Sequence, residues 1–235
     1  MKHSEFYDYL DSELDAIISS EVYSPYFIKH KQDEQKKSAA FLIWFLKTYA
    51  DTGIVEEYIT DGHDDFSCDI ILDKNDSQRV KSYYIVQSKW NNKKNCDSEF
   101  DGKELKSFLS DIQSVLKGKK EKGANEKFNE KYDELREHIK NNGRVKVIFL
   151  SLKNNCDTSN DNIRSLKEVM SGDIDVEGFD INRLKIDFIY REYKKSITPN
   201  PLDNIYDPGL ERIEMQVCRD GGNSCVEIKA PFNAY

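Results

Sequence analysis

Three polar side chains lie where two short β-type runs could bring them together. Asp69 lies among apolar residues in the run Ser67–Leu72, and Gln87 and Lys89 end the run Val80–Trp90. Because side chains alternate between the faces of a strand, Gln87 and Lys89 project to the same face. If the two runs pair as a hairpin, Asp69 can converge with both. A carboxylate, an amide oxygen and an ammonium group at one point could hold a divalent cation and a water molecule.

The same three residues also have an ordinary structural interpretation. Asp69 could lie at a strand edge, while Gln87 and Lys89 form the solvated side of a half-buried strand. Against this, they end a run, Tyr83–Val86, that has the composition of a strand buried on both faces. Polar groups in such surroundings usually have a partner or a function. Ionisable clusters are enriched at functional sites without being confined to them, so both interpretations stay open at this point.

The elements that must position these residues alternate between helical and extended patterns. The predicted helices cover residues 4–21, 28–49, 98–117, 125–141 and 160–170. The predicted strands are Val55–Thr60, Ser67–Leu72, Val80–Trp90, Arg144–Leu152 and Leu184–Arg191. Strands mixed with helices in this way predict an α/β fold, with a sheet covered by helices.

The second predicted helix has two unlike halves. Its second half, AAFLIWFLKTY, is apolar nearly all round, which predicts that it is buried against the sheet. Its first half is polar and contains Glu34, which could reach the Asp69 site from the side. A solvated helix face is the more ordinary role for Glu34.

A Pro-rich connector, ITPNPLDNIYDPG, is the best candidate domain boundary in the chain. We therefore expect one domain over residues 1–195 and a β-rich extension over 196–235, which would begin a further domain if the chain is part of a longer protein. Within the extension, a hairpin with Gly221-Gly222 as its two-residue loop would place Cys218 opposite Cys225. A cross-strand disulfide is conceivable there, and two facing reduced thiols are the alternative.

Composition limits the classes of function. The net charge of −8 argues against generic, charge-driven binding of nucleic acid, although a metal site and a local basic rim would still allow a nuclease. Such a rim could lie between Lys89 and Lys131, where 11 Lys stand against 8 Asp plus Glu. The longest apolar run, Ala39–Leu46, is too short to span a bilayer, and the start lacks the apolar core of a signal peptide. With five cysteines and no Cys-x-x-Cys pair, we expect a cytoplasmic protein with reduced thiols and no membrane partner.

The residues named above carry a resemblance to a known family. Asp65-x-x-x-Asp69, a hairpin and then Val86-Gln87-Ser88-Lys89-Trp90 resemble the PD-(D/E)xK nuclease superfamily, in its Gln-x-Lys branch, which includes Mrr-like restriction endonucleases. The stretch from Asp61-Gly62 to Asp69 is most similar to the N-terminal part of abortive infection phage resistance proteins. The resemblance covers residues 28–152. It departs from the family at Phe66-Ser67-Cys68, where Gly-Gly-Ile is usual, which puts the turn before Asp69 in question.

The resemblance implies a restriction-endonuclease-like core in the order α-β-β-β-α-β with a mixed central sheet, an extra N-terminal helix and a C-terminal β-rich extension. It implies hydrolysis of DNA with Mg²⁺, which Mn²⁺ could replace, in anti-phage defence; RNA is not excluded as a substrate. Asp69, Gln87 and the Ser88 backbone carbonyl would hold the metal, and Lys89 would position or deprotonate the attacking water. Asp65 and Glu34 are candidates for support, through a second ion or a metal-bound water. A homodimer would suit cleavage of both strands.

Two rival functions remain, and two other residues need an ordinary explanation. The fold could serve as a catalytically silent nucleic-acid-binding or interaction module, or as a structural or regulatory domain of a larger defence protein. The intact set Asp69, Gln87 and Lys89 speaks against a silent module. His63 lies in the acidic loop, where a single histidine is more often exposed than functional. Trp90 is expected to pack against a helix rather than stack on a base.

Overall fold

The structure is a computed structural model that describes residues 1–50, 55, 57–75, 80–100, 102–170, 174–197, 214–220 and 223–229. The chain divides into two compact units, Met1–Ile186 and Asp187–Tyr235, and the division falls within one helix. Among the described residues, the helices are α1 (His3–Ile18), α2 (Ser24–Phe27), α3 (Asp33–Phe45), α4 (Gly102–Leu116), α5 (Glu126–Lys140), α6 (Asp157–Val169) and α7 (Ile181–Ile197). The strands are β1 (Ile70–Asn75), β2 (Lys81–Lys89), β3 (Arg144–Ser151), β4 (Ile174–Phe179), β5 (Glu214–Asp220) and β6 (Asn223–Lys229). Short helical turns lie at Glu21–Tyr23, Leu46–Ala50 and Lys93–Asn95.

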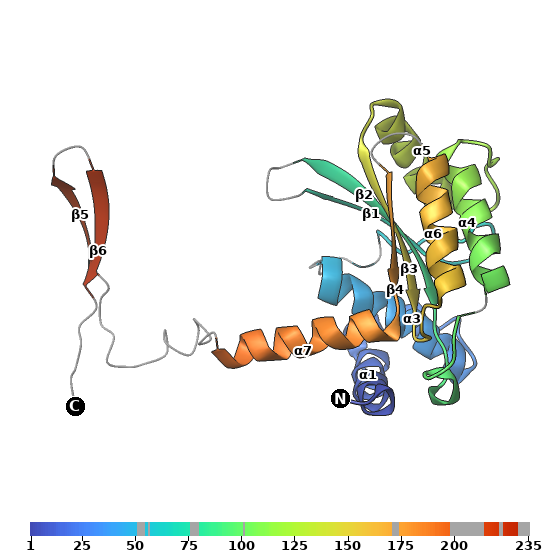
Figure 1. The fold of residues 1–235 in the computed structure, drawn as a ribbon, viewed down its shortest axis with the longest axis horizontal. Helices are drawn as coiled ribbons and strands as arrows, with labels where there is room; N and C mark the ends of the chain where they lie inside the picture. The colour runs from blue at the N-terminus through green and yellow to red at the C-terminus, as the bar shows by residue number, and fades with distance from the viewer. Residues whose placement is uncertain are drawn as a thin grey trace. The chain divides into compact units, whose positions relative to one another are not determined.

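Four strands of the first unit form one mixed, open sheet in the order β1-β2-β3-β4 (Figure 1). β1 and β2 are antiparallel, whereas β2 pairs with β3 and β3 with β4 in parallel. Parallel neighbours need a crossover connection, which α4 and α5 provide between β2 and β3, and α6 provides between β3 and β4. The expected α/β fold, with a mixed sheet flanked by helices, is confirmed at this level.

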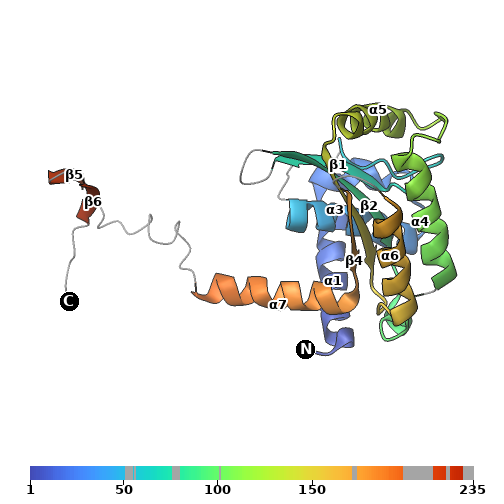
Figure 2. The ribbon, with the colours of Figure 1, turned by 45° about the horizontal axis from the view of Figure 1, so that its top comes forward.

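Helices cover both faces of the sheet (Figure 2). On one face, α4, α5 and α6 contribute to a single core with strand residues such as Tyr83, Ile85 and Phe149. On the other face lies α3, in which every residue from Ala39 to Phe45 is buried, as its apolar sequence predicts. Gln87 follows Ile85 by two positions, so it projects to the face covered by α4. Its side chain therefore lies where the sheet ends beside α4.

The predicted strand over Leu184–Arg191 is wrong, because these residues lie in α7. The alternation of apolar residues in this segment indicated a period of two, yet Leu184 is buried and Ile186 is 62% exposed. Two residues apart on a strand would share a face, whereas on a helix they diverge. The carboxylate of Asp180 accepts a hydrogen bond from the backbone N–H of Arg183 at 2.9 Å, which starts the helix. This capping signal outweighs the alternation.

The predicted strand over Val55–Thr60 is reduced to a single bridge in the residues described. Ile59 pairs with Ile70 outside any strand, and the N–H of Tyr58 donates to the Val55 carbonyl in a turn. Because the chain turns at Val55–Tyr58, only the last residues of the segment reach the edge of β1. Residues 54 and 56 lie outside the described residues.

Two further differences concern strand limits. β1 begins at Ile70, later than the predicted Ser67, because the preceding residues form the turn described below. No strand is predicted over Ile174–Phe179, yet these residues form β4 at the edge of the sheet. Apolar and polar residues alternate there, but the run is short and contains Gly178, which weakens a strand signal.

The second unit contains a two-stranded hairpin of β5 and β6. Its register pairs Cys218 with Cys225 and Asp220 with Asn223, as the predicted two-residue loop requires. The loop itself, the Pro-rich connector and the side chains of the hairpin lie outside what the structure describes. The three cysteines described with their side chains, Cys68, Cys96 and Cys156, form no disulfide. None of the helices in the described residues has the length and apolar character to cross a bilayer.

Candidate metal centre

Asp69 and Gln87 meet where the pairing of β1 with β2 ends. The register that pairs Ile70 with Val86 continues one step to place Asp69 opposite Gln87. Gln87 Nε2 donates a hydrogen bond to Asp69 Oδ2 at 3.0 Å, and the backbone N–H of Ser88 donates to the same oxygen at 2.6 Å. Both side chains are buried, with 7% exposure each. The hairpin therefore brings together two of the three predicted residues in direct contact.

Lys89 faces the same place from the last position of β2. Its Nζ lies 3.4 Å from Glu104 Oε1 on α4, and the two side chains are 40% and 44% exposed. Asp69, Gln87 and Lys89 all line one cleft of about 440 Å³. The cleft is walled by the end of the sheet, the loop before β1, α4 and α3.

The loop before β1 is a tight turn built on Asp65. Asp65 Oδ2 accepts a hydrogen bond from the N–H of Gly62 at 3.0 Å, and Oδ1 accepts one from the N–H of Ser67 at 2.9 Å. Asp64, Phe66 and Ser67 all have positive φ, at 60°, 49° and 63°. Glycine adopts this conformation without steric cost. Phe66 and Ser67 occupy the two positions at which the resembled family has Gly-Gly, so the turn keeps a glycine-like backbone without glycine.

Side-chain contacts hold this strained turn in place. The ring of Phe66 packs against Phe128 with centroids 5.3 Å apart, and Lys120 Nζ lies 4.6 Å from the centroid of the Phe66 ring. Ser67 Oγ donates to Asp111 Oδ2 at 3.2 Å. The left-handed conformation costs roughly 1–2 kcal/mol per non-glycine residue. Contacts with α4, α5 and the segment between them offset that cost and fix the loop.

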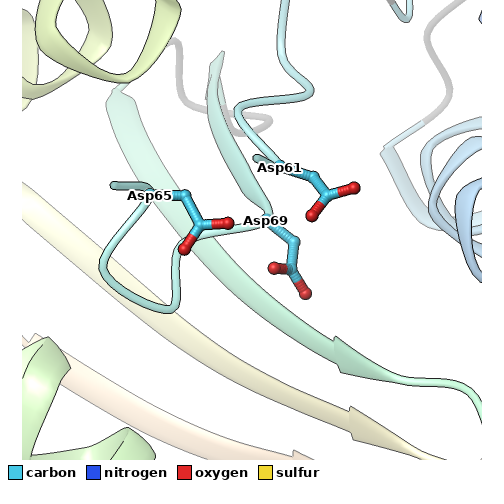
Figure 3. A group of neighbouring side chains, drawn as sticks. All are labelled: Asp61, Asp65 and Asp69. Atoms are coloured by element: carbon cyan, nitrogen blue, oxygen red, sulfur yellow. The ribbon is translucent and has the colours of Figure 1, made fainter. Parts of the chain in front are cut away.

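Asp61 joins Asp65 and Asp69 in a group of three carboxylates. One oxygen of each lies within 4.8 Å of the others, with Asp61 and Asp65 flanking Asp69 in Figure 3. Burial raises the pKa of Asp69 well above its ordinary value; the Ser88 N–H opposes this, and Asp61 and Asp65 add to it. Burial also raises the pKa of Asp65, against its two backbone hydrogen bonds, and Lys89 acts to lower both pKa values. Concentrated negative charge with little compensation is the electrostatic setting of a cation site.

The oxygen atoms in this group fit a hard divalent cation. Gln87 Oε1 is buried without a hydrogen-bond partner. Both hydrogen bonds to Asp69 reach Oδ2, so Oδ1 accepts none among the described residues. The Ser88 carbonyl lies beside them, since Gln87 Nε2 approaches it at 3.4 Å. Carboxylate, amide and backbone carbonyl oxygens are the ligands that Mg²⁺ and Mn²⁺ take in proteins.

The other predicted residues do not join the group. Glu34 is exposed in the first turn of α3 and does not line the cleft. His63 has a side chain that is 91% exposed. Trp90 packs against Tyr7 of α1 and Phe41 of α3, with ring centroids 5.3 and 5.5 Å apart. Trp90 therefore packs on helices, as expected, although part of it also lines the cleft.

The lysine-rich segment 89–131 is partly neutralised by its own acidic neighbours. Lys120 Nζ lies 3.0 Å from Asp111 Oδ1, and Lys122 Nζ lies 2.5 Å from Asp133 Oδ2. These ion pairs reduce the positive charge available to a phosphate backbone. The basic rim stays a prediction.

Two residues that line the cleft, Asp61 and Glu104, are not predicted as site residues from the sequence. Asp61 belongs to the Asp-Gly pair of the family resemblance, so a pattern signal for it existed. Glu104 lies on the polar face of α4, and only the packing of α4 beside β2 brings it to Lys89. No spacing rule within the chain would have identified it.

No family model, curated protein or solved structure matches this chain. Its function is therefore argued from the residues and their geometry.

Proposed function

We propose that this chain is a metal-dependent nuclease that hydrolyses phosphodiester bonds, with DNA as the first candidate substrate and RNA as the second. The observation that carries the proposal is the buried Asp69–Gln87 pair, which lines an acidic cleft next to Lys89 and in which Gln87 Oε1 is buried without a hydrogen-bond donor. A purely structural Asp–Gln pair would leave no buried acceptor unsatisfied, because an unmade hydrogen bond costs about 1–3 kcal/mol. A role in anti-phage defence rests on the sequence resemblance alone.

The order of elements supports a restriction-endonuclease-like core as the finer description of the fold. α3 is followed by the Ile59 bridge, β1, β2, α4, α5 and β3. This order is similar to the α-β-β-β-α-β order that the resemblance implies, but it has a bridge where a first strand is expected and two helices, α4 and α5, before β3. Proteins with the same fold can have different functions, so the proposed function rests on the residues of the site.

Asp69, Gln87 and the Ser88 carbonyl are the residues that would hold Mg²⁺ or Mn²⁺. When bound, the cation would polarise the scissile phosphate and lower the pKa of a coordinated water. The Ser88 N–H and Gln87 Nε2 fix the Asp69 carboxylate by hydrogen bonds, so its orientation is set before any ligand arrives. Such preorganisation is what a catalytic site requires of its supporting contacts.

Lys89 would contact the phosphate. Its side chain is 40% exposed at the cleft, and within the part of the chain that the structure describes its ammonium group pairs with one carboxylate, Glu104, from which it can be released. Facing the reacting phosphate, it would offset the negative charge that develops during hydrolysis and orient the attacking water.

The charge of the cleft predicts strict dependence on a cation. Of the described residues, four acids line it, Asp61, Asp65, Asp69 and Glu104, together with one lysine, Lys89. An anionic substrate meets a repulsive surface unless a divalent cation is present. Metal removal should therefore abolish both productive binding and cleavage.

The test is cleavage of supercoiled plasmid, single-stranded DNA and single-stranded RNA with Mg²⁺ or Mn²⁺, and with EDTA as control. We expect metal-dependent nicking by the wild type, and a loss of at least 100-fold in Asp69→Ala and Lys89→Ala, the scale on which removing one such group acts. Asp64→Asn is the matched control, since Asp64 lies in the same loop outside the acidic group, and asparagine tolerates positive φ. Substrate binding that is indifferent to metal and to Lys89→Ala, without cleavage, would instead support a silent binding module.

A further inference from the structure

The position of Asp61 relative to Asp69 is set by the backbone. The Ile59–Ile70 bridge joins the two segments, and the N–H groups of Thr60 and Asp61 both donate to the Asp69 carbonyl, at 2.9 and 3.2 Å. Thr60 is buried, and its hydroxyl donates to the Cys68 carbonyl. The reduced first strand thus delivers Asp61 to Asp69 as a fixed neighbour rather than as a free loop residue.

A second contact reinforces this placement from α5. Asn125 caps α5 by accepting a hydrogen bond from the Phe128 N–H at 3.0 Å through its side-chain oxygen. The amide nitrogen of the same side chain donates to the Thr60 carbonyl at 2.8 Å. One residue therefore starts a helix and holds the segment that carries Asp61.

Among the described residues, the Asp61 carboxylate differs from its acidic neighbours in accepting no hydrogen bond, although it interacts electrostatically with His30. Asp64 accepts a hydrogen bond from the Ala124 N–H at 3.0 Å, and Asp65 closes the turn through Gly62 and Ser67. Within the described residues, no hydrogen bond or ion pair engages the side chain of Asp61. It lines the cleft with an oxygen within 4.8 Å of oxygens of Asp65 and Asp69. Negative charges held this close repel one another, and a bound cation would offset that repulsion.

An independent observation points to a ligand at this place. The side chain of Gln87 is more than nine-tenths buried, lines the same cleft and keeps Oε1 without any donor. Donors are scarce around these oxygens, and the acceptors outnumber them. A divalent cation can coordinate several such oxygens at once, whereas one water can donate to two at most.

We propose that Asp61 is a metal ligand that supplies the negative charge which the Gln-x-Lys motif lacks. This inference rests on the proposed nuclease function. In it, Asp61, Asp69 and Gln87 hold the cation together. With bond lengths of about 2.0–2.1 Å, oxygens on opposite sides of Mg²⁺ lie roughly 4 Å apart. The observed upper limit of 4.8 Å among the three carboxylates is close to this spacing, so a small closure suffices.

The test measures Mn²⁺ binding by isothermal titration calorimetry to the full chain, without substrate. We compare the wild type with Asp61→Asn, Asp69→Asn and the control Asp64→Asn. We expect at least a 10-fold loss of affinity in Asp61→Asn and in Asp69→Asn, and a change below 2-fold in the control. Because Asp61 is half-exposed and its side chain makes no contact that the fold needs, Asp61→Asn should fold normally, which circular dichroism checks.

The outcomes separate this inference from the proposed function. If Asp69→Asn loses Mn²⁺ while Asp61→Asn binds as the wild type does, the role of Asp61 is refuted and the Asp69 site stands. If Asp69→Asn also binds as the wild type does, the metal site of the proposed function itself is wrong. Wild-type protein that binds no Mn²⁺ at millimolar concentration contradicts both. A second readout is the half-maximal Mn²⁺ concentration for nicking, which Asp61→Asn should raise at least 10-fold.

Discussion

At the scale of single residues, the buried Asp69 carboxylate makes function and stability oppose each other. Burial raises its pKa well above the ordinary value, so between the unfolded and folded pKa values the folded state holds a proton that the unfolded state has lost. The stability that this group contributes is present below the unfolded pKa and is lost as the pH rises through the folded pKa. Above the unfolded pKa and without metal, the buried Asp69 is therefore a cost to folding.

Asp69→Asn should accordingly stabilise the metal-free protein at pH 8. Asparagine keeps an oxygen acceptor for the Ser88 N–H and removes the charge, so we expect a gain on the order of 1 kcal/mol, or ~2–4 °C in melting temperature. The gain should shrink as the pH falls toward 4. Thermal melts in EDTA from pH 4 to 8 measure it. A wild type that is more stable than Asp69→Asn at pH 8 would contradict the account of this site.

Ser67 offers a test of the strained turn. Ser67→Ala loses the hydrogen bond to Asp111 and keeps the positive φ of 63°, whereas Ser67→Gly loses the same bond and relieves the backbone. We therefore expect Ser67→Gly to be more stable than Ser67→Ala by about 1 kcal/mol. Urea unfolding compares them. Equal stability, or a more stable alanine variant, would mean that the turn adopts another conformation.

At the scale of elements, α4 controls the cleft through Glu104. The Lys89–Glu104 pair is about half exposed, so it contributes little to stability, typically about 0–1 kcal/mol. Glu104→Gln removes a negative charge from the cleft and releases Lys89 toward the substrate. We expect KM for nucleic acid to fall roughly 3-fold or more at low salt, as electrostatic steering predicts, with an unchanged melting temperature. Glu130→Gln, an exposed acid on α5, serves as control. A lower kcat with unchanged KM would show instead that Glu104 positions Lys89.

Helices and strands whose local sequence pattern favours one structure could be predicted from the sequence. Those for which two local patterns disagree could not. The β1–β2 hairpin follows from two apolar runs and a polar turn, and its register alone brings Asp69 to Gln87. α7 could not be recognised from alternation, because the cap at Asp180 and the burial of one helical stripe decide it. The approach of Asp61 to Asp69 depends on the Ile59–Ile70 bridge and on hydrogen bonds beside it, which leave no periodic trace in the sequence.

At the scale of the whole molecule, every residue of the proposed site belongs to the first compact unit, Met1–Ile186. A chain that ends at Ile197 retains this unit and the whole of α7. We expect it to unfold cooperatively and to keep the Mn²⁺ affinity and nicking rate of the full chain within about 2-fold, since the proposed ligands are unchanged. Calorimetric melts and the nicking assay measure both. A large loss of activity with unchanged Mn²⁺ affinity would assign substrate recognition to residues 198–235.

The net charge of −8 is a poor guide to whether the protein binds nucleic acid, because it sums over the whole chain and does not describe the site. The composition argues against nucleic acid as a partner, while the cleft argues for a divalent cation that would offset most of the local negative charge. A measurement of metal dependence therefore distinguishes a nuclease from a protein that does not act on nucleic acid more directly than a binding assay without metal.

The most direct measurement is the initial rate of plasmid nicking at saturating Mn²⁺ for the wild type, Asp69→Asn and Asp64→Asn. The account predicts that EDTA abolishes nicking, that Asp69→Asn reduces it at least 100-fold, which corresponds to about 2.7 kcal/mol of transition-state stabilisation, and that Asp64→Asn nicks at nearly the wild-type rate. Nicking by Asp69→Asn at the wild-type rate, or by the wild type in EDTA, would contradict it.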